Sequence, residues 1–457
     1  MIKQIFYGIY DFLWADLFSF QIGSIQLGLP LLVLILIPVG IYFMIKTRFL
    51  PIRMFPQMIQ VCKEKKVGTE TESISGFQAL IISTATRVGM GNLVGVVAAI
   101  SVGGAGAVFW MWISAIVGSA TAFIEATLAQ LYKEKDPLYG GYRGGPAYYL
   151  HAFFAKGKKK SIIAILFALS GLLCWGGISQ VIGNSVTSAF KNAFHIPPIT
   201  TITILVIIAA IIVLRRNATV KVLDIIVPIM ACSFFAITIF IILTNITLIP
   251  SVFHRIFTEA FGLRQVVGGG FGAVLMNGVK RGLFSNEAGS GSAPCAAAAA
   301  DISHPVKEGL LQSLGVFIDT IVICTCTAMI MLLTPDSVVQ GLAGMDLLQA
   351  AMNYHMGSFG VIFIAVVLWL FSFSTFIGIL FYARGNVAYL FGDNWTSQTI
   401  YKIFCLVMLF IGGLAAYTFV WDLGDIGIGL MTIFNMLGLL PMSKYALQAL
   451  KEYEKRV

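Results

Sequence analysis

The sequence has little charge for its length. Only 11% of the 457 residues are Asp, Glu, Lys or Arg, whereas 58% are hydrophobic, and the mean hydropathy is +0.89. Soluble domains carry about 25% charged residues, so this composition excludes an ordinary soluble protein. It identifies a membrane protein, for which the lipid bilayer is the first expected partner.

The chain also lacks the residue patterns of several other classes of protein. Its seven cysteines show no paired spacing, so neither a disulfide framework nor a zinc site is indicated. Its five histidines fall in loops or at span ends, and no HExxH pair or Ser-His or Cys-His arrangement lies at depth. A repeated pore motif, which is typical of channels, is also absent. We therefore predict neither an enzyme nor a channel, and no cofactor.

The first twenty residues lack the basic start and the small-residue cleavage site of a signal peptide. They are rich in aromatic residues and include Asp11 and Asp16. We expect them to form an amphipathic helix that lies in the membrane interface.

What the sequence does contain is a succession of apolar stretches that match the thickness of a bilayer core, which needs about 20 residues per helix. Eleven such spans are predicted, at residues 27–45, 77–101, 106–131, 161–189, 198–214, 222–248, 266–282, 308–334, 358–381, 401–420 and 424–443.

The positive residues indicate the orientation of these spans. Most of the 30 Lys and Arg lie in alternate loops, and positive loops stay on the cytoplasmic side. The pattern places the N-terminus outside the cytoplasmic membrane and the C-terminus inside, with Lys280 and Arg281 among the cytoplasmic charges. Because this topology accounts for the net charge of +9, nucleic acid is not an expected partner. The sequence gives no oligomeric state.

Ten of the spans divide into two sets of five that follow one extra N-terminal span. Because five is odd, the two sets cross the membrane in opposite directions, as in the inverted repeats of many secondary transporters. We therefore predict an all-α polytopic membrane protein with a 5+5 inverted repeat and two broken helices. The expected parts are 1–72 (interfacial helix, first span and basic cytoplasmic loop), 73–250 and 251–447 (the two repeats), and 448–457 (cytoplasmic tail).

Each set opens with a glycine-rich span, which contains RVGMGN in the first set and VVGGGFGAVLMNG in the second. Glycine costs about 1 kcal/mol relative to alanine inside a helix, so both spans are expected to unwind there. Unwound backbone is tolerated in a membrane where it meets protein, an ion, a substrate or water. Close helix packing explains either cluster taken alone, but the matching positions beside Asn92 and Asn277 favour binding.

Longer motifs in the chain are more distinctive. They are RVGMGNLVGVVAAISVGGAGAVFWMWISAIVGSATAFIEATLAQLY, YRGGPAYYL, KRGLFSNEAGSGSAPCAAAAA, FIDTIVICT and FSFSTFIG. At these motifs the chain resembles the alanine-or-glycine:cation symporter family, whose members resemble the leucine-transporter-type inverted-repeat fold. The resemblance covers nearly the whole chain after residue 73. It implies sodium-coupled uptake of small neutral amino acids, which are held between the two broken spans.

The sequence departs from the pattern of that family at four positions. Met90 stands where the family usually has Thr, Ile379 where it has Trp, and Arg384 where it has an acid. Ile182 stands where a glutamine is expected, with Gln180 nearby as a substitute. These changes favour a more apolar and differently shaped pocket that accepts a residue larger than alanine.

A zwitterionic amino acid needs donors for its carboxylate, acceptors for its ammonium group and a cavity for its side chain. The backbone of the first glycine turn can supply the donors, assisted by a helix N-terminus, and carbonyls of the second break can accept from the ammonium group. The predicted substrate-binding residues are Gly89, Met90, Gly91, Asn92, Ile182, Met276, Asn277, Gly278 and Ile379.

A sodium ion is bound by several oxygens, which a hydroxyl pair on one helix and free carbonyls on another can supply. Hydroxyls in transmembrane helices more often bond to their own backbone. The family resemblance implies instead that Ser374 and Thr375 face the first broken span. The implied cation-binding residues are Ala85, Val88, Ser374 and Thr375, and no other metal is expected.

Three ionisable residues lie inside predicted spans, where charge is costly and usually functional. Arg87 and Asp319 lie at similar depths, and Glu125 is shallower by roughly 6 Å at a rise of about 1.5 Å per residue. We predict that Arg87 is neutralised by Asp319 or Glu125. Three roles of Arg87 stay open. It forms a structural ion pair that fixes the helices, or it forms an ion pair that opens and closes during gating. In the third role its cation takes the place of sodium, so that a proton drives transport.

Together these features predict a secondary active transporter of the cytoplasmic membrane. We expect sodium-coupled symport of a small neutral amino acid such as alanine or glycine by alternating access. The alternative is a proton-coupled or altered-specificity symporter of the same fold that takes a larger neutral amino acid.

Overall fold

The structure, a computed structural model, describes residues 2–22, 25–64, 74–155, 159–215, 219–261 and 271–456. Helices dominate these ranges, because a helix satisfies its backbone hydrogen bonds internally, as a bilayer requires. The N-terminal part contains α1 (Ile2–Trp14), β1 (Asp16–Ile22), β2 (Ile25–Pro30), α2 (Leu31–Lys46), α3 (Leu50–Arg53) and α4 (Phe55–Val61).

The next part begins with three helical segments that follow one another without a gap. They are α5 (Gly76–Thr86), the π-helical segment η1 (Arg87–Gly95) and α6 (Val96–Gly103). The elements after them are α7 (Gly106–Leu131), β3 (Glu134–Lys135), β4 (Tyr142–Arg143), α8 (Pro146–Phe154), α9 (Ile162–Phe194), α10 (Pro198–Val213), α11 (Thr219–Thr244), η2 (Ile246–Leu248) and α12 (Ile249–Ala260).

The C-terminal part contains α13 (Phe271–Asn286), α14 (Pro294–Ala297), α15 (Pro305–Phe317), the π-helical segment η3 (Ile318–Cys324), α16 (Thr325–Leu332), α17 (Asp336–Val339), α18 (Gly344–Phe391), α19 (Trp395–Leu414) and α20 (Tyr417–Glu454). Helix α18 is bent at Gly357, where φ is 61° and ψ is −153°. The predicted cytoplasmic tail from residue 448 continues α20 as far as Glu454.

Seven helices in the described ranges are long and apolar enough to cross a membrane, or up to eight if one bent pair is a single span. The bent pair is Pro228–Thr244 with Ile246–Ala260, at an angle of 77°. The shorter apolar helices α2 and α10 have 16 residues each. The prediction of a helical membrane protein is therefore confirmed, whereas the exact number of spans stays a prediction.

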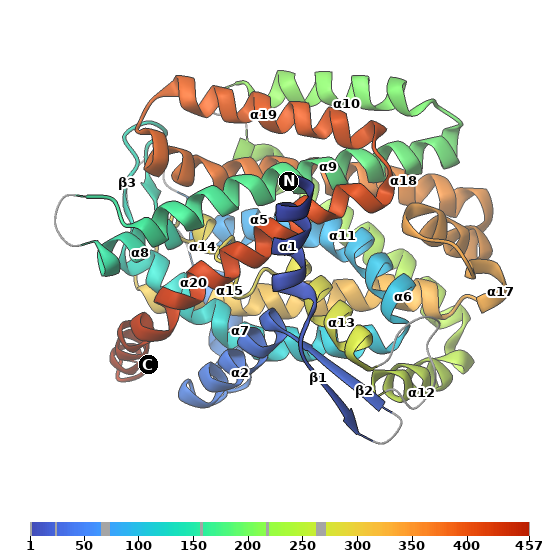
Figure 1. The fold of residues 1–457 in the computed structure, drawn as a ribbon, viewed down its shortest axis with the longest axis horizontal. Helices are drawn as coiled ribbons and strands as arrows, with labels where there is room; N and C mark the ends of the chain where they lie inside the picture. Colours follow the sequence, from blue (N-terminus) through green and yellow to red (C-terminus); the bar gives the residue numbers. More distant parts are fainter. Residues whose placement is uncertain are drawn as a thin grey trace.

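The arrangement of the helices places α9 at the centre of one side of the bundle. It packs against α18, α19 and α20, and α10 and α19 lie side by side along one edge (Figure 1). Helix α7 packs against α13 and α15 on the other side. Sequence segments that are far apart therefore meet in the interior.

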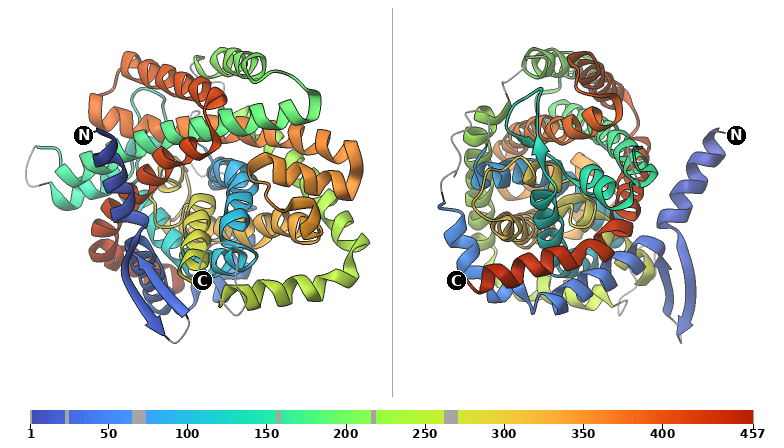
Figure 2. Two further views of the ribbon diagram at one scale, coloured as in Figure 1. Left: turned by 45° about the vertical axis from the view of Figure 1, so that its right-hand side comes forward. Right: turned by 90° about the vertical axis from the view of Figure 1, so that its left-hand side faces the viewer.

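The N-terminal segment forms the expected helix, α1, but the hairpin of β1 and β2 after it was not predicted. Helix α1 lies on the outside of the bundle and the hairpin projects from it (Figure 2). Leu13 and Trp14 at the end of α1 are buried, and the Trp14 indole donates to the carbonyl of Asp425 at 3.0 Å. These contacts fix α1 to α20.

The structure corrects the placement of two positive residues. Lys280 and Arg281 were expected in a cytoplasmic loop, but both are buried inside α13. Arg281 forms two hydrogen bonds of 3.0 Å with the Asp425 carboxylate of α20, and Lys280 forms an ion pair with the same carboxylate. A buried positive charge is stable with such a partner, so these residues carry no information about loop orientation.

Candidate functional site

Polar side chains from several elements meet in the interior of the helix bundle. They come from η1, α7, η3, α18, α20 and the end of α13 with the segment that follows it. Polar groups buried at membrane depth are costly and usually functional, so this set is the candidate site. We name it the polar junction, and it consists of Arg87, Asn92, Glu125, Ser285, Glu287, Asp319, Thr375, Tyr382 and Asn435, all of them buried.

The first predicted break is not an unwound turn. Gly89 to Asn92 lie in η1, a π-helical segment that continues the helix on both sides. A Cβ added to Gly89 would lie 1.9 Å from the Thr375 hydroxyl, and one added to Gly91 would lie 2.9 Å from Cα of Ser285. These glycines therefore allow α18 and α13 to approach η1 closely.

The part of the second predicted break that was assigned to the substrate is helical. Met276, Asn277 and Gly278 are helical residues of α13, and the Asn277 amide donates to its own backbone at Ala273. Gly278 packs against Ala107 and Trp110 of α7, so it is a packing glycine. The glycines at 268–270 lie outside the described residues.

Within the described residues, a helix interruption lies between α13 and α14, in the segment 287–293. Glu287, Gly289 and Gly291 have φ values of 58°, 96° and 84°, which a right-handed helix cannot contain. We name residues 287–293 the second break.

The free backbone groups of the second break are satisfied by two helices. The N–H of Gly289 donates to Glu125 of α7 at 3.0 Å, and the Gly289 carbonyl accepts from the Asn435 amide of α20 at 3.0 Å. The Asn435 amide also donates to Glu125, and Tyr149 donates to the Asn435 oxygen. Glu125 therefore holds the second break in place and is not the ion-pair partner of Arg87.

Arg87 pairs with an acid that sequence analysis did not select. Its Nε lies 4.0 Å from Oε2 of Glu287, and its Nη1 donates to the carbonyl of Gln312 at 3.5 Å. Glu287 also accepts from the Tyr382 hydroxyl at 3.2 Å. Within the part of the chain that is described, Nε and Nη2 of Arg87 make no hydrogen bond. The guanidinium thus sits between η1 and the second break with part of its donor capacity unused.

Asp319 joins η1, α13 and η3 through hydrogen bonds. Its carboxylate accepts from the hydroxyls of Ser285 at 2.8 Å and Thr320 at 2.9 Å, and its backbone carbonyl accepts from the Asn92 amide at 3.0 Å. The Ser285 hydroxyl lies 3.3 Å from the Asn92 oxygen and 3.0 Å from the Cys324 sulfur. The predicted ion pair between Arg87 and Asp319 is therefore replaced by a hydroxyl-rich cluster around Asp319.

The two hydroxyls that family resemblance assigned to the cation lie in α18. Thr375 accepts from the backbone N–H of Met90 at 3.3 Å, which places it against η1. The Ser374 hydroxyl donates to the Phe371 carbonyl at 2.9 Å in its own helix. The backbone of Ala85 and Val88 belongs to α5 and η1, and the side chains of these two residues lie outside the described set. The cation-binding assignment stays a prediction.

The apolar residues assigned to the substrate side chain come from three elements. Met90 of η1, Ile182 of α9 and Ile379 of α18 are all buried. Gln180 of α9 is also buried, and its amide lies 3.9 Å from the Met408 sulfur of α19. Gln180 therefore faces α19.

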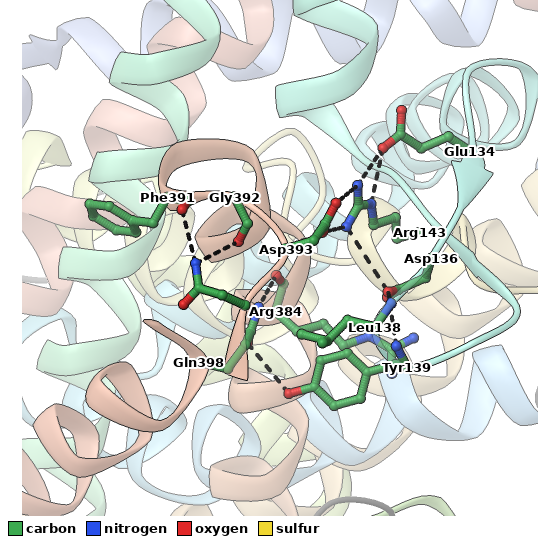
Figure 3. Close-up of polar contacts among 12 residues, drawn as sticks. Glu134, Asp136, Leu138, Tyr139, Arg143, Arg384, Phe391, Gly392, Asp393 and Gln398 are labelled. Atoms are coloured by element: carbon green, nitrogen blue, oxygen red, sulfur yellow. Dashed lines mark hydrogen bonds and ion pairs between the residues drawn. The ribbon is translucent and has the colours of Figure 1, made fainter. Parts of the chain in front are cut away.

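A second polar network lies where the β3–β4 segment meets the connection between α18 and α19 (Figure 3). Arg143 donates to Glu134 at 2.8 Å and to Asp393, and it lies 4.0 Å from Asp136. Arg384 lies over the ring of Tyr139 at 5.0 Å, and burial raises the pKa of Tyr139 to about 12. This network ties two connections between helices together, and its Arg384 is the residue that stands where the family has an acid.

Two residues of the polar junction were missed although their motif was noticed. Ser285 and Glu287 belong to the motif KRGLFSNEAGSGSAPCAAAAA, which was used above only for the resemblance to the family. The signal that could have identified them is a charged residue beside glycines at the end of an apolar span, which is costly in a membrane unless it is paired. Tyr382 and Asn435 lie in apolar helices and gave no signal of their own.

A bundle of apolar helices with a broken helix and a buried polar junction defines a multi-pass membrane transporter. The chain matches the model of the sodium:alanine symporter family over residues 16–457, and it belongs to that family.

Several relatives agree with this assignment. The chain is 44% identical over 432 residues to the probable sodium/glutamine symporter GlnT of Bacillus subtilis, which covers 93% of this chain and 88% of that protein. It is 41% identical to the amino-acid carrier protein AlsT of the same organism, with 98% and 91% covered. It is 34% identical to the sodium/alanine symporter AgcS of Methanococcus maripaludis, with 93% and 94% covered.

A solved structure supports the fold alone. A crystal structure of the manganese transporter of Eremococcus coleocola, mutant H236A, matches with a TM-score of 0.50 and 15% identity, over 82% of this chain and 78% of that chain. Both proteins therefore share a helical fold over these parts.

Proposed function

We propose that the chain is a sodium-coupled symporter that imports a neutral amino acid by alternating access. In this proposal it crosses the cytoplasmic membrane eleven times, with its N-terminus outside, its C-terminus inside and ten spans arranged as two inverted sets of five. Membership of the sodium:alanine symporter family supports this proposal. So do relatives whose names specify sodium and an amino acid.

The observation that carries the proposal is the contact between η1 and the second break inside the bundle. Backbone groups that leave the regular helical pattern there are available to a ligand only when the surrounding helices separate. We propose that the substrate is held between Gly89–Asn92 and the second break, so that the carbonyls at Met276–Gly278 are not used. The Glu287 carboxylate and nearby carbonyls would accept from the ammonium group of the substrate.

Sodium is proposed to bind beside this site. Thr375 already contacts η1 through the Met90 N–H, and the carbonyls of Ala85 and Val88 lie at the end of α5 and in η1, respectively. Ser374 is its neighbour in α18. Sodium prefers several oxygens of this kind, so this set is retained as the cation site.

A larger neutral amino acid is the second candidate substrate. The relative with 44% identity is named for glutamine, and the chain has Ile379 where the resemblance to the family predicts an indole. Ile182 and Met90 add apolar surface in place of polar side chains. These features favour a side chain larger than that of alanine.

The experiment is uptake of labelled glycine, alanine and glutamine into proteoliposomes, with either an imposed sodium gradient or an imposed proton gradient. Saturable uptake that needs the sodium gradient is expected. The matched variant Ile379→Trp should shift the ranking toward the smaller amino acids by about tenfold, because filling a pocket changes discrimination by roughly 1–3 kcal/mol. Uptake of none of the three substrates under a sodium gradient would contradict the proposal. A ranking unchanged by Ile379→Trp would contradict the assigned pocket.

A further inference from the structure

A further buried acid lies between the polar junction and the end of the bundle at which α15 begins. Glu308, in the first turn of α15, is 0% exposed. Its Oε1 accepts from the Gln312 amide at 2.8 Å. In the described part of the protein, its Oε2 has no hydrogen-bond partner and the residue forms no ion pair. One hydrogen bond is poor compensation for a buried ionised carboxylate, so the neutral acid is the stable form there.

Glu308 is connected to the polar junction through one helical turn. Gln312 donates to Glu308 with its side chain and accepts from Arg87 Nη1 with its carbonyl at 3.5 Å. A Cβ added to Gly315 would lie 2.7 Å from the same Arg87 nitrogen, so α15 is pressed against the guanidinium. Movement of η1 and Arg87 must therefore displace the face of α15 that carries Glu308.

In the described ranges, the cations near Glu308 already have partners elsewhere. Lys133, at the end of α7, donates to Gln130 and to the carbonyl of Ala300. Lys307 pairs with Glu64, after α4, at 2.6 Å. Arg87 is paired with Glu287. Among the described residues, Cys62 at the end of α4 is a further titratable group that interacts with Glu308.

The unpartnered oxygen of Glu308 faces the start of α5. A Cβ added to Gly76, the first residue of α5, would lie 3.3 Å from Oε2. Helix α5 leads directly into η1, so separation of α5 from α15 would open the substrate site and would also bring water to this oxygen.

We infer that Glu308 is a proton-binding site of the transport cycle, protonated while α5 packs against α15 and ionised when the two helices separate. The inference rests on the proposed function, because the separation is the opening step of alternating access. The step is balanced: the O–H bond of the carboxylic acid breaks, water takes the proton, and the carboxylate becomes hydrated. No other covalent bond changes.

The first test looks for the protonated acid in the closed protein. Infrared difference spectra between the wild type and Glu308→Gln, both saturated with sodium and a transported amino acid at neutral pH, should show the carbonyl stretch of a protonated carboxylic acid that the variant lacks. Glu64→Gln, which removes an acid that is already paired, is the matched control and should leave that band in place. Absence of the band from the ligand-bound proteins would overturn the inference and leave the proposed function intact.

The second test measures protons during closure. Sodium and a transported amino acid are added to detergent-solubilised protein in weak buffer with a pH dye, and ligand binding is followed by tryptophan fluorescence. Closure should take up about one proton per protein molecule in the wild type and in Glu64→Gln, and none in Glu308→Gln. Equal proton uptake by Glu308→Gln, or binding without proton uptake in the wild type, would overturn the inference and leave the proposed function intact. Failure of every amino acid to bind would contradict the proposed function instead.

Discussion

The two glycine-rich segments of this protein behave differently. In η1, Gly89 and Gly91 are part of a continuous helix. Thr375 and Ser285 pack into the space that side chains at these two positions would need. In the second break, Glu287, Gly289 and Gly291 leave the helix, and Glu125 and Asn435 satisfy the freed backbone groups at Gly289. Glycine thus allows close packing in η1 and a left-handed backbone in the second break. Which of the two conformations forms depends on the contacts that the neighbouring helices make.

Arg87 links the two segments, so removing its charge should have the largest effect. Arg87→Gln leaves Glu287 buried without its cation, and breaking a buried pair costs about 3–5 kcal/mol of unfolding free energy. We expect a large loss of thermal stability in detergent and near-complete loss of sodium-driven uptake.

Arg255→Gln is the control for this variant, because its pairs with Glu259 and Asp336 are more exposed and should be worth about 1 kcal/mol or less. The double variant Arg87→Gln with Glu287→Gln should regain part of the stability. Stability, uptake and ion dependence that are unchanged in Arg87→Gln would show that the pair has no role.

Packing in η1 should give the next largest effect. In Gly91→Ala the new Cβ meets the Ser285 backbone at 2.9 Å, and such overpacking costs about 1–3 kcal/mol. Gly95→Ala is the matched control in the same segment, because its new Cβ has no neighbour closer than 3.9 Å. Thermal unfolding and uptake of the two variants are compared, and equal behaviour would mean that η1 does not depend on this contact.

The cation site should respond more selectively. Thr375→Val keeps the shape but removes a hydroxyl, and loss of one such oxygen ligand is expected to cost about 1 kcal/mol, which raises the half-saturating sodium concentration roughly five- to tenfold.

Thr432→Val is the control for the sodium measurement, because the Thr432 hydroxyl donates to the Ile428 carbonyl of its own helix. The half-saturating concentration is measured from uptake at varied sodium. If both variants keep the sodium dependence of the wild type, Thr375 is not a cation ligand.

The smallest effect is expected at the start of α15, outside the polar junction. Burial, with smaller contributions from Arg456 and Lys307, lowers the pKa of His304, whose ring accepts from the N–H of Val306. The folded protein therefore binds fewer protons at His304 than the unfolded chain does. The free energy of unfolding consequently decreases as the pH falls below about 6.5.

Because His304 is only partly buried, the change should stay below about 1 kcal/mol. The melting temperature should fall slightly more in the wild type than in His304→Asn between about pH 7.5 and pH 5.5, since asparagine can cap the helix but does not titrate there. An identical pH dependence of the melting temperature in the two proteins would show that His304 does not contribute to it.

Much of the fold and part of the site could be predicted from local sequence. The apolar stretches predicted a helical membrane protein, and the rarity of charge marked Arg87, Glu125 and Asp319, all of which are buried in the polar junction. The pairing could not be predicted, because depth along separate spans does not say which faces meet. Glu287 was missed for the same reason. Lys280 and Arg281 were assigned to a loop because no local pattern shows that they pair with Asp425, which lies 144 residues away from Arg281.

The sequence by itself determined the class of this protein: apolar length requires a membrane, helices follow from the need to satisfy backbone groups in lipid, and the long motifs indicate the family. Only the tertiary structure decided where the helix breaks and which acid pairs with Arg87. The reason is physical, since glycine permits both a tightly packed helix and a left-handed turn. The choice depends on hydrogen bonds from residues, such as Glu125 and Asn435, that only folding brings beside the second break.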